Sequence, residues 1–235
     1  IVDPMNGRKI LSISGANSGA DIQVTDMSFS IPSRIATLDS DADGLTDRLY
    51  FGDTGGQVWR VDLAEEGVPL SGPSSTGTVI GKLADISGTA KENRRRFFEP
   101  PSIVQVTDTS GFSDNEEYDL VLIGTGNRPD PLAETVKDNF YGFRDTKIGK
   151  NELVDKGDNT SDGTYPNADG KAFTHENLVN VTQKGLGELD KEAVKVANGY
   201  FFSFAEANSG RAGEKMLSRP LTAGGSVVFT TFDPV

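Results

Sequence analysis

The sequence predicts an all-β fold, part of a modified β-propeller that also carries a long polar insertion. Three observations predict it. Short runs of β-forming residues alternate with turn residues near both ends of the 235-residue chain. Glycine is abundant, at 27 residues, whereas only 35% of the residues are hydrophobic. One strand–turn–strand pattern also recurs. Short strands joined by many turns are typical of sandwiches, barrels and propellers, and the recurrence favours the propeller.

The expected strands are short and are bounded by turn-forming residues. We expect strands at Lys9–Ser14, Arg34–Leu38, Arg48–Gly52, Gln57–Leu63, Thr78–Ile86, Ser102–Val106, Asp119–Gly124, Asn139–Asp145, Gly199–Ala205 and Ser226–Phe232.

The recurring pattern is an apolar strand that enters a Gly-rich turn and leaves in an aromatic-bearing strand. Asp47–Leu63 can be laid on Asp119–Arg128 with Gly52 over Gly124, an offset of 119 − 47 = 72 residues. A poorer third copy, "GGSVVFTTFDP", lies near the C-terminus. This pattern is typical of propeller blades with four antiparallel strands. We interpret Trp59, the single tryptophan, as a blade-packing residue, with a ligand platform as the alternative.

We interpret the chain as a fragment of a single propeller domain, because at most three blades are visible and a ring needs at least four. A short helix is expected at Gly187–Ala197 within the polar insertion. The predicted parts are a domain over 1–235, a first blade over about 34–86, a second from about 102, the insertion over about 128–198 and last strands over 199–235.

Composition excludes several classes of function. The net charge of −12 disfavours nucleic acid and anionic membranes as partners. The absence of cysteine excludes disulfides, thiolate catalysis and Cys-ligated metals. No apolar run approaches the roughly 20 residues of a membrane span. The first residue is not Met, so we expect an excerpt of a longer chain, with any targeting segment outside it.

The stretch "LDSDADGLTD" places aspartates at alternate positions around one glycine. Asp39, Asp41, Asp43 and Asp47 occupy loop positions 1, 3, 5 and 9, and glycine occupies position 6. Calcium prefers six to eight oxygen ligands, which carboxylates at this spacing supply. Position 7, here Leu45, donates its main-chain carbonyl and needs no polar side chain. The sequence therefore predicts a Ca²⁺ site; an acidic surface hairpin and a Mg²⁺ site are the alternatives.

The loop departs from an EF-hand at two points. Position 12 is Tyr50 instead of a bidentate glutamate, and a strand follows instead of a helix. Asp47 must then complete the coordination directly or through water.

Other candidate sites have weaker support. "DNTSDG" half-matches a second calcium loop through Asp158, Thr160 and Asp162. His175, the single histidine, is interpreted as a solvated loop residue. The basic run Lys91–Phe97 is interpreted as a solvated turn that pairs with nearby acids, with contact to an anionic partner as the alternative.

Several segments together resemble the PilY/PilC pilus-tip proteins of type IV pili. They are "RIATLDSDADGLTDRLYFGDTGGQVWRVDL", "DLVLIGTGNR", "DNFYGFRD" and "GEKMLSRPLTAGGSVVFTTFDP". The resemblance covers Arg34 to Pro234, and the join of the aspartate loop to "LYFGDTGGQVWRVDL" is its most specific part. It implies a C-terminal modified propeller related to quinoprotein propellers.

The resemblance also implies a function. Members of this family are secreted to the bacterial surface and act in pilus biogenesis, adhesion and twitching motility. Calcium occupancy of their loop governs whether pili stay extended or are retracted. Carried over, the regulatory ligands are Asp39, Asp41, Asp43, Leu45 (main chain) and Asp47. The implied partners are type IV pilus subunits or assembly machinery, together with a host or surface receptor. No Arg-Gly-Asp motif occurs, so integrin binding is not implied.

Two alternatives to the regulatory role stay open. Calcium could stabilise an extracellular adhesin propeller without any switching, or the chain could be a quinoprotein-type dehydrogenase. Such enzymes need a quinone on a Trp platform and a catalytic carboxylate. Because the only tryptophan occupies a blade position and one loop supplies the whole calcium site, we expect no enzymatic activity.

Overall fold

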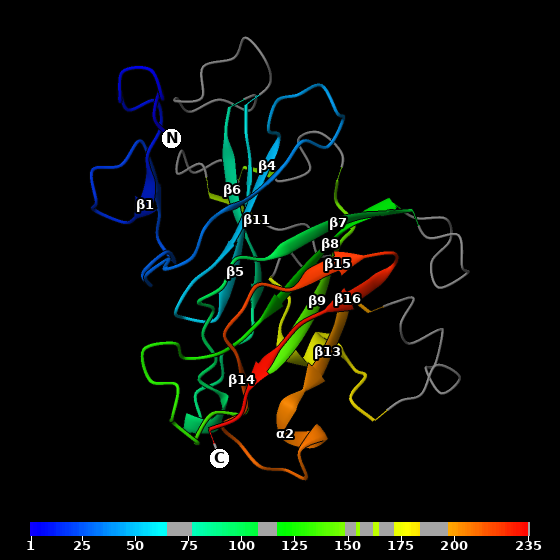
Figure 1. Cartoon of the computed structure of the whole chain (residues 1–235). Helices are drawn as coiled ribbons and strands as arrows, with labels where there is room; N and C mark the ends of the chain where they lie inside the picture. The colour runs from blue at the N-terminus through cyan, green and yellow to red at the C-terminus, as the bar shows by residue number, and fades with distance from the viewer. Residues whose placement is uncertain are drawn as a thin grey trace.

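The computed structural model describes residues 1–64, 77–107, 117–148, 154–155, 162–164, 172–183 and 197–234. Its regular structure is almost entirely β and is organised around two large sheets (Figure 1). The helical elements among the described residues are short: η1 (Lys91–Asn93), η2 (His175–Asn177) and α2 (Phe204–Ala207). No helix in this part of the chain has the length and apolar character needed to cross a membrane.

The first sheet has six strands in the order β10-β11-β6-β5-β4-β3. Strands β3 to β6 form an antiparallel meander, and β11 adds to β6 in parallel. The strands are β3 (Ala36–Leu38), β4 (Arg48–Gly52), β5 (Gln57–Asp62), β6 (Val79–Asp85), β10 (Val154–Asp155) and β11 (Asp162–Thr164).

The second sheet has five strands in the order β12-β13-β9-β8-β7. Strands β7, β8, β9 and β13 are antiparallel neighbours, and β12 pairs with β13 in parallel. The strands are β7 (Ser102–Thr107), β8 (Glu117–Gly124), β9 (Asn139–Asp145), β12 (Val179–Asn180) and β13 (Gly199–Ser203).

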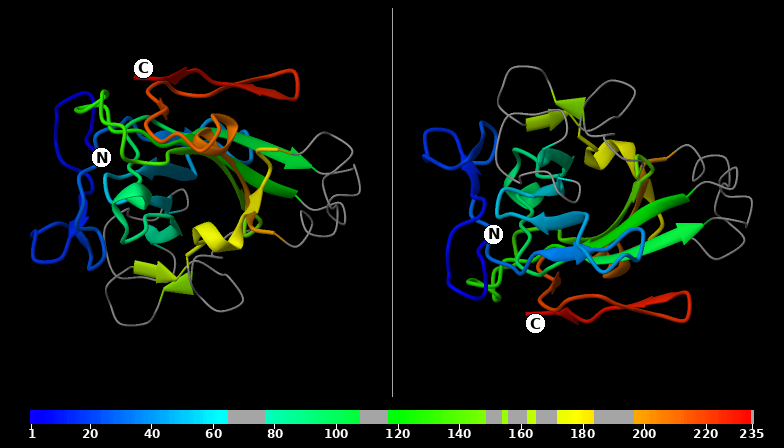
Figure 2. Two further views of the ribbon diagram at one scale, coloured as in Figure 1. Left: turned by 90° about the horizontal axis from the view of Figure 1, so that it is seen from below. Right: turned by 90° about the horizontal axis from the view of Figure 1, so that it is seen from above.

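Three two-stranded pieces complete the described structure. The hairpin of β15 and β16 lies over the outer side of the second sheet (Figure 2), where Val227 and Phe229 pack against the aromatic cluster of Phe140 and Phe204. The strands are β1 (Ile13–Gly15) with β2 (Ile22–Val24), β14 (Lys215–Met216) with β17 (Thr231–Phe232), and β15 (Leu221–Ala223) with β16 (Ser226–Val228).

Side-chain alternation along β5 gives the first sheet two apolar faces. Val58 joins the core between the sheets, and Trp59 joins the cluster under the N-terminal segment. Because successive side chains of a strand point to opposite faces, both faces of a central strand must be apolar when both are covered. Trp59 is 1% exposed, and its Nε1–H donates to Asp53 Oδ2 at 2.9 Å. The interpretation of Trp59 as a packing residue is confirmed.

The two glycines aligned by the repeat both end a strand against a large side chain. A Cβ on Gly52 would lie 2.5 Å from Cβ of Phe97, and one on Gly124 would lie 2.1 Å from Sδ of Met216. Real Cβ atoms do not approach other atoms so closely. Any side chain would separate the strand end from the segment packed on it, so the repeat preserves glycine for close packing.

A buried network of charged groups joins the first sheet to the second. Arg48 Nη1 donates to Asp119 Oδ2 at 2.9 Å, and Arg60 Nη1 donates to Asp145 Oδ2 at the same distance. Tyr50 Oη lies 2.9 Å from a carboxylate oxygen of each of these aspartates. Every donor is on β4 or β5 and both aspartates are on β8 or β9. The network therefore joins the two sheets as well as neutralising charge.

The charged groups of this network stay ionised only while each keeps its partner of opposite charge. Burial acts to lower the pKa of Arg60, but the carboxylates of Asp145 and Asp62 outweigh it and raise that pKa well above its ordinary value. Burial raises the pKa of Asp119, which the charge of Arg48 only partly opposes. A buried ion that loses its partner is costly, whereas an intact pair roughly offsets its own desolvation.

Much of the predicted strand pattern is confirmed. The strands expected at Arg48–Gly52, Gln57–Leu63, Asp119–Gly124 and Asn139–Asp145 form at close to the expected bounds. They make the antiparallel pairs β4–β5 in the first sheet and β8–β9 in the second. Each sheet contains four neighbouring antiparallel strands, as a propeller blade would. The described residues show no closed ring, so the propeller itself stays a prediction.

Other expectations differ from the structure. The C-terminal third copy of the repeat forms two separate pairs, β15–β16 and β14–β17, instead of a blade. The strand expected to run through Ala205 ends at Ser203, whose side chain accepts from the N–H of Glu206 and starts α2. The helix expected at Gly187–Ala197 lies mostly outside the described residues.

His175 does not behave as a solvated loop histidine. Its ring packs on Phe201, with ring centroids 4.2 Å apart, and Nδ1 lies 3.2 Å from Tyr141 Oη. Burial lowers the pKa of His175 to about 4, and the charge of Arg95 adds to the effect. The interpretation was wrong because no sequence pattern indicated that this short turn would fold back onto the aromatic core.

Replacing Arg60 tests the network. Arg60→Met should lower the free energy of unfolding by about 3–5 kcal/mol, because it removes the cation paired with the fully buried carboxylate of Asp145. Urea denaturation measures this. Arg8→Met is the matched control, since Arg8 is exposed and should change stability by less than about 0.5 kcal/mol. A loss no larger than that of the control would contradict a stabilising role for the network.

The single histidine permits a direct test of its burial. In an NMR titration the imidazole of His175 should titrate near pH 4. Its folded-state pKa lies below its unfolded-state value, so the stability linked to it is complete above about pH 6.5 and is lost as the pH falls through about 4. A midpoint at the ordinary histidine value would show that the ring is hydrated.

Candidate metal centre

The acidic loop connects β3 to β4 at an edge of the first sheet. Leu38 pairs with Arg48 where the two strands meet the loop, and the N–H of Asp47 donates to the carbonyl of Leu38 at 2.9 Å. The loop is therefore anchored at both ends by the sheet.

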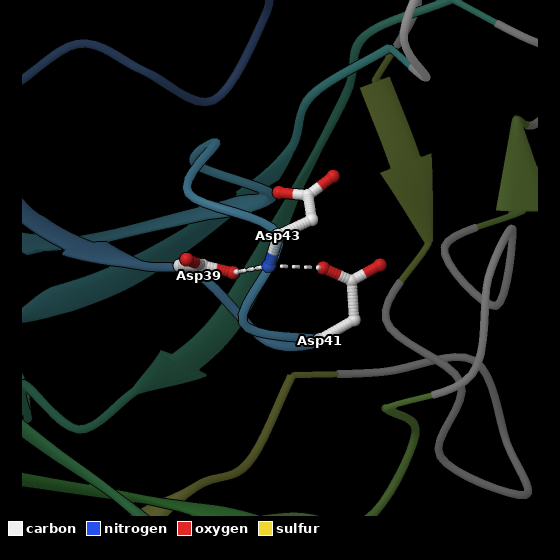
Figure 3. A group of neighbouring side chains, drawn as sticks. All are labelled: Asp39, Asp41 and Asp43. Atoms are coloured by element: carbon white, nitrogen blue, oxygen red, sulfur yellow. Dashed lines mark hydrogen bonds between the residues drawn. The ribbon is translucent and has the colours of Figure 1, made fainter.

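Three of the four predicted carboxylates come together. Asp39, Asp41 and Asp43 each offer an oxygen, and these oxygens all lie within 4.8 Å of one another (Figure 3). Asp41 and Asp43 are exposed, and Asp39 is half-buried. Two ligands on opposite sides of a calcium ion are separated by about 4.6–5.2 Å, twice the usual Ca–O distance. The group fits around a single ion of that size.

Backbone N–H groups hold these carboxylates in place. The N–H of Asp43 donates to Oδ1 of Asp39 and of Asp41, each at 3.2 Å (Figure 3). The N–H of Gly44 donates to Asp39 Oδ2 at 2.9 Å. The loop thus winds around its own carboxylates, which partly offsets their mutual repulsion.

The winding requires two residues with positive φ. Gly44 has φ of 91° with open space around it, and Ala42 has φ of 62°. Glycine adopts the left-handed region without steric cost, which supports the role predicted for position 6 of the loop. The positive φ of Ala42 was not anticipated from the sequence, because alanine rarely adopts it.

Asp47 and Leu45 occupy different surroundings from the three clustered aspartates. The N–H and Oγ–H of Ser40 both donate to Asp47 Oδ2 at 2.5 Å. Burial acts to raise the pKa of Asp47, but the hydrogen bonds from Ser40 and the charge of Arg48 outweigh it and lower that pKa. Asp47 is therefore held ionised as a clasp between the two ends of the loop. The side chain of Leu45 is 50% exposed, as suits a residue whose expected contribution is its carbonyl.

Ser40 is the functional residue that sequence reasoning missed. Its signal was present, because serine and threonine side chains commonly bond to acidic side chains and backbone groups in turns. A loop that presents alternate ligands leaves its intervening residues free for this second task.

The remaining sequence candidates do not add to this centre. Asp158 and Thr160 lie outside the described residues, and only the backbone of Asp162 is described. The basic run is not simply a solvated turn: Arg95 is 6% exposed and donates through Nε to the carbonyl of Lys137 at 2.9 Å, whereas Arg94 and Arg96 are exposed.

The comparisons with known proteins agree with one another. The chain is 23% identical over 238 aligned residues to the type IV pilus biogenesis factor PilY1 of Pseudomonas aeruginosa strain UCBPP-PA14, covering 83% of this chain and 19% of PilY1. It superimposes over its whole length on the crystal structure of the Pseudomonas aeruginosa PilY1 C-terminal domain, with a TM-score of 0.62 and 18% identity. No family model matches the chain.

Both matched proteins are longer than this chain, so each match covers only part of them. The chain spans about a fifth of the PilY1 sequence and half of the solved domain. The sequence comparison and the structural comparison both match PilY1. The chain therefore has the fold of the matched half of the PilY1 C-terminal domain, and the predicted resemblance to PilY/PilC-type pilus-tip proteins is confirmed.

Proposed function

We propose that this chain is the calcium-binding part of a type IV pilus biogenesis protein at the bacterial surface. In this proposal, calcium occupancy of the Asp39–Asp47 loop controls pilus extension versus retraction and thereby adhesion and twitching motility. Its partners are pilus subunits or the assembly machinery. The similarity to a protein named as a pilus biogenesis factor supports this role.

The observation that carries the proposal is the convergence of three carboxylates in one loop. The oxygens of Asp39, Asp41 and Asp43 are close enough to share an ion, and nothing else in their surroundings supplies a positive side chain at ion-pair distance among the described residues. The ion would relieve the repulsion between these carboxylates and add favourable coordination. The carbonyl of Leu45 and water would complete six to eight oxygens. Calcium suits this set better than magnesium, which needs a tighter octahedral arrangement.

Calcium would act on the loop by favouring its ordered form. A ligand shifts a two-state element only through its differential affinity for the two states. At a hundred times Kd, calcium would stabilise the filled loop by about 2.7 kcal/mol. This suffices for control if the empty loop is near balance between order and disorder. Asp41 and Asp43 are exposed, which supports the proposal that the ordered loop contacts a pilus component.

The contacts between the loop and the core determine whether calcium binding affects only the loop or also the packing of the two sheets. Asp47 clasps the loop through Ser40, while the next residue, Arg48, enters the buried network. The network has its own partners and does not need the ion. Calcium is therefore expected to order the loop without being required for the packing of the two sheets, which favours a switch over a structural staple.

An enzymatic role has less support. Trp59, the residue type that a quinone platform needs, is fully buried with its N–H bonded to Asp53. It offers no exposed face to a cofactor. The fold shared with a PilY1 domain agrees with a role in pilus biogenesis instead of catalysis.

Calorimetry tests the calcium site. We expect one dominant ion to bind with micromolar to submillimolar Kd, since extracellular sites bind at about 10⁻⁴–10⁻³ M and high ligand charge tightens binding. Asp43→Ala should abolish this binding. Asp26→Ala is the matched control, because Asp26 is exposed and lies in another turn. An Asp43→Ala isotherm equal to that of the unchanged chain would refute the assignment.

A cellular experiment separates the switch from the staple. In the bacterium that encodes this chain, Asp43→Ala should alter surface piliation and twitching, while the purified variant stays folded by circular dichroism and limited proteolysis. Asp26→Ala should change neither property. If Asp43→Ala unfolds the chain, calcium is a staple. If the variant is folded and piliation is normal, calcium has no regulatory role.

A further inference from the structure

A second polar site lies at the opposite end of the hairpins from the acidic loop. It is a pocket of about 210 Å³ beside the strand ends at Gly52 and Gly124, formed by the segment that follows β6, the connection from β8 to β9, and β14. Its lining includes Lys91, Arg94, Arg96, Asn127, Asp138 and Lys215. The pocket is smaller than most drug-sized sites, so it suits a ligand about the size of one amino-acid residue.

Two oxygens at this pocket lack hydrogen-bond donors. Asp138 is 1% exposed, and its Oδ2 has no partner among the described residues. Oδ1 of Asn127, which also lines the pocket, is buried without a partner. A buried acceptor without a donor is costly, and most such groups in native proteins are satisfied. Both oxygens can therefore accept a hydrogen bond from an N–H or O–H group of a molecule in the pocket.

The internal lysine of the pocket does not meet this need. Lys215 is 1% exposed, and its ammonium group donates to the carbonyl of Ala133 at 2.8 Å and to that of Pro131. It is committed to the loop before β9 and forms no ion pair with Asp138. Its charge also opposes the entry of a bare metal cation, even though carboxylate oxygen is present.

Three exposed basic side chains line the pocket together with the one exposed carboxylate of Asp130, so cations predominate among its exposed charged residues. Arg94, Arg96 and Lys91 are exposed, and none of their side chains has a hydrogen-bond or ion-pair partner within the described part of the chain. Guanidinium groups present several donors in a planar arrangement that matches a carboxylate. The unpaired basic side chains can bind an anionic group of a ligand, and the unpaired oxygens of Asp138 and Asn127 can accept hydrogen bonds from the same ligand.

We propose that this pocket binds a ligand in which an N–H donor and a carboxylate are carried on the same carbon atom. An ammonium group bonds to both Asp138 Oδ2 and Asn127 Oδ1, a single amide N–H bonds to one of them, and the carboxylate bonds to Arg94 and Arg96. A simple anion leaves both acceptors unsatisfied and meets the charge of Asp138, whereas a simple cation is repelled at the entrance. A free α-amino acid and the C-terminal residue of a peptide both have the required chemistry.

Four probes test the proposal with the ¹⁵N-labelled chain. They are L-alanine, N-acetyl-L-alanine as a C-terminal residue, propionate as a carboxylate alone, and inorganic phosphate. Alanine or N-acetylalanine should shift the amide signals of residues around Arg96, Asn127 and Lys215. Propionate and phosphate should bind at least about tenfold more weakly, since each lacks the donor.

The results with alanine and N-acetylalanine show whether the ligand is a free amino acid or the C-terminal residue of a peptide. Binding of alanine alone indicates a free amino acid, because only its ammonium group supplies a full charge to Asp138. Binding of N-acetylalanine, with or without alanine, indicates a peptide C-terminus. Binding of neither probe overturns the proposal, as does propionate binding equal to that of both.

Substitutions place the ligand in the pocket. Arg94→Gln and Arg96→Gln should each weaken binding about tenfold or more. Both positions are exposed, so these variants should fold. Arg8→Gln, an exposed change in the N-terminal segment, is the control and should bind normally. Asp138→Asn should also weaken binding of alanine. Unchanged affinity in both arginine variants would overturn the assignment, whatever the behaviour of Asp138→Asn.

Discussion

The packing of the two sheets depends on one buried set of charges. Arg48 and Arg60 leave the first sheet and meet Asp119 and Asp145 of the second, while Tyr50 contacts both aspartates. Apolar packing alone tolerates sliding between two flat faces. Buried hydrogen-bonded ions do not, because a displaced pair exposes each charge to an apolar core. The network therefore favours one alignment of the sheets, and the aromatic core beside it is packed in that alignment.

The two candidate sites lie at the two ends of this aligned pair of hairpins. At one end, the carboxylate loop enters β4 through Asp47, directly before Arg48 of the network. At the other end, Gly52 and Gly124 let Phe97 and Met216 approach closely, and the connections that line the second pocket are held there. A packed core thus carries both candidate sites on the loops at its ends, which is the usual division between scaffold and binding surface.

Both residue spacing and tertiary contacts determine the positions of the aspartates in the acidic loop. Spacing alone brings Asp39, Asp41 and Asp43 to one point, because alternate residues of a tight loop face its centre and Gly44 permits the turn. The fourth aspartate is assigned by context instead. Asp47 is bound by Ser40 and lies beside the charge of Arg48, so it clasps the loop in this structure. Calcium entry would have to draw it in directly or through water.

The sequence by itself determined the parts of the protein that depend on neighbours along the chain. The hairpins, their Gly turns and the convergence of the loop aspartates follow from strand alternation, glycine geometry and ligand spacing, all of which act over a few residues. Only the tertiary structure decided which strands face each other, why Arg48 and Arg60 are buried, and where Asp138, Asn127 and Arg96 meet. These residues are separated by long stretches of sequence, and no periodic signal links an arginine to an aspartate 71 or 85 positions away. Charge burial is therefore visible only when the whole chain has folded, because its stability depends on partners that the sheets bring together.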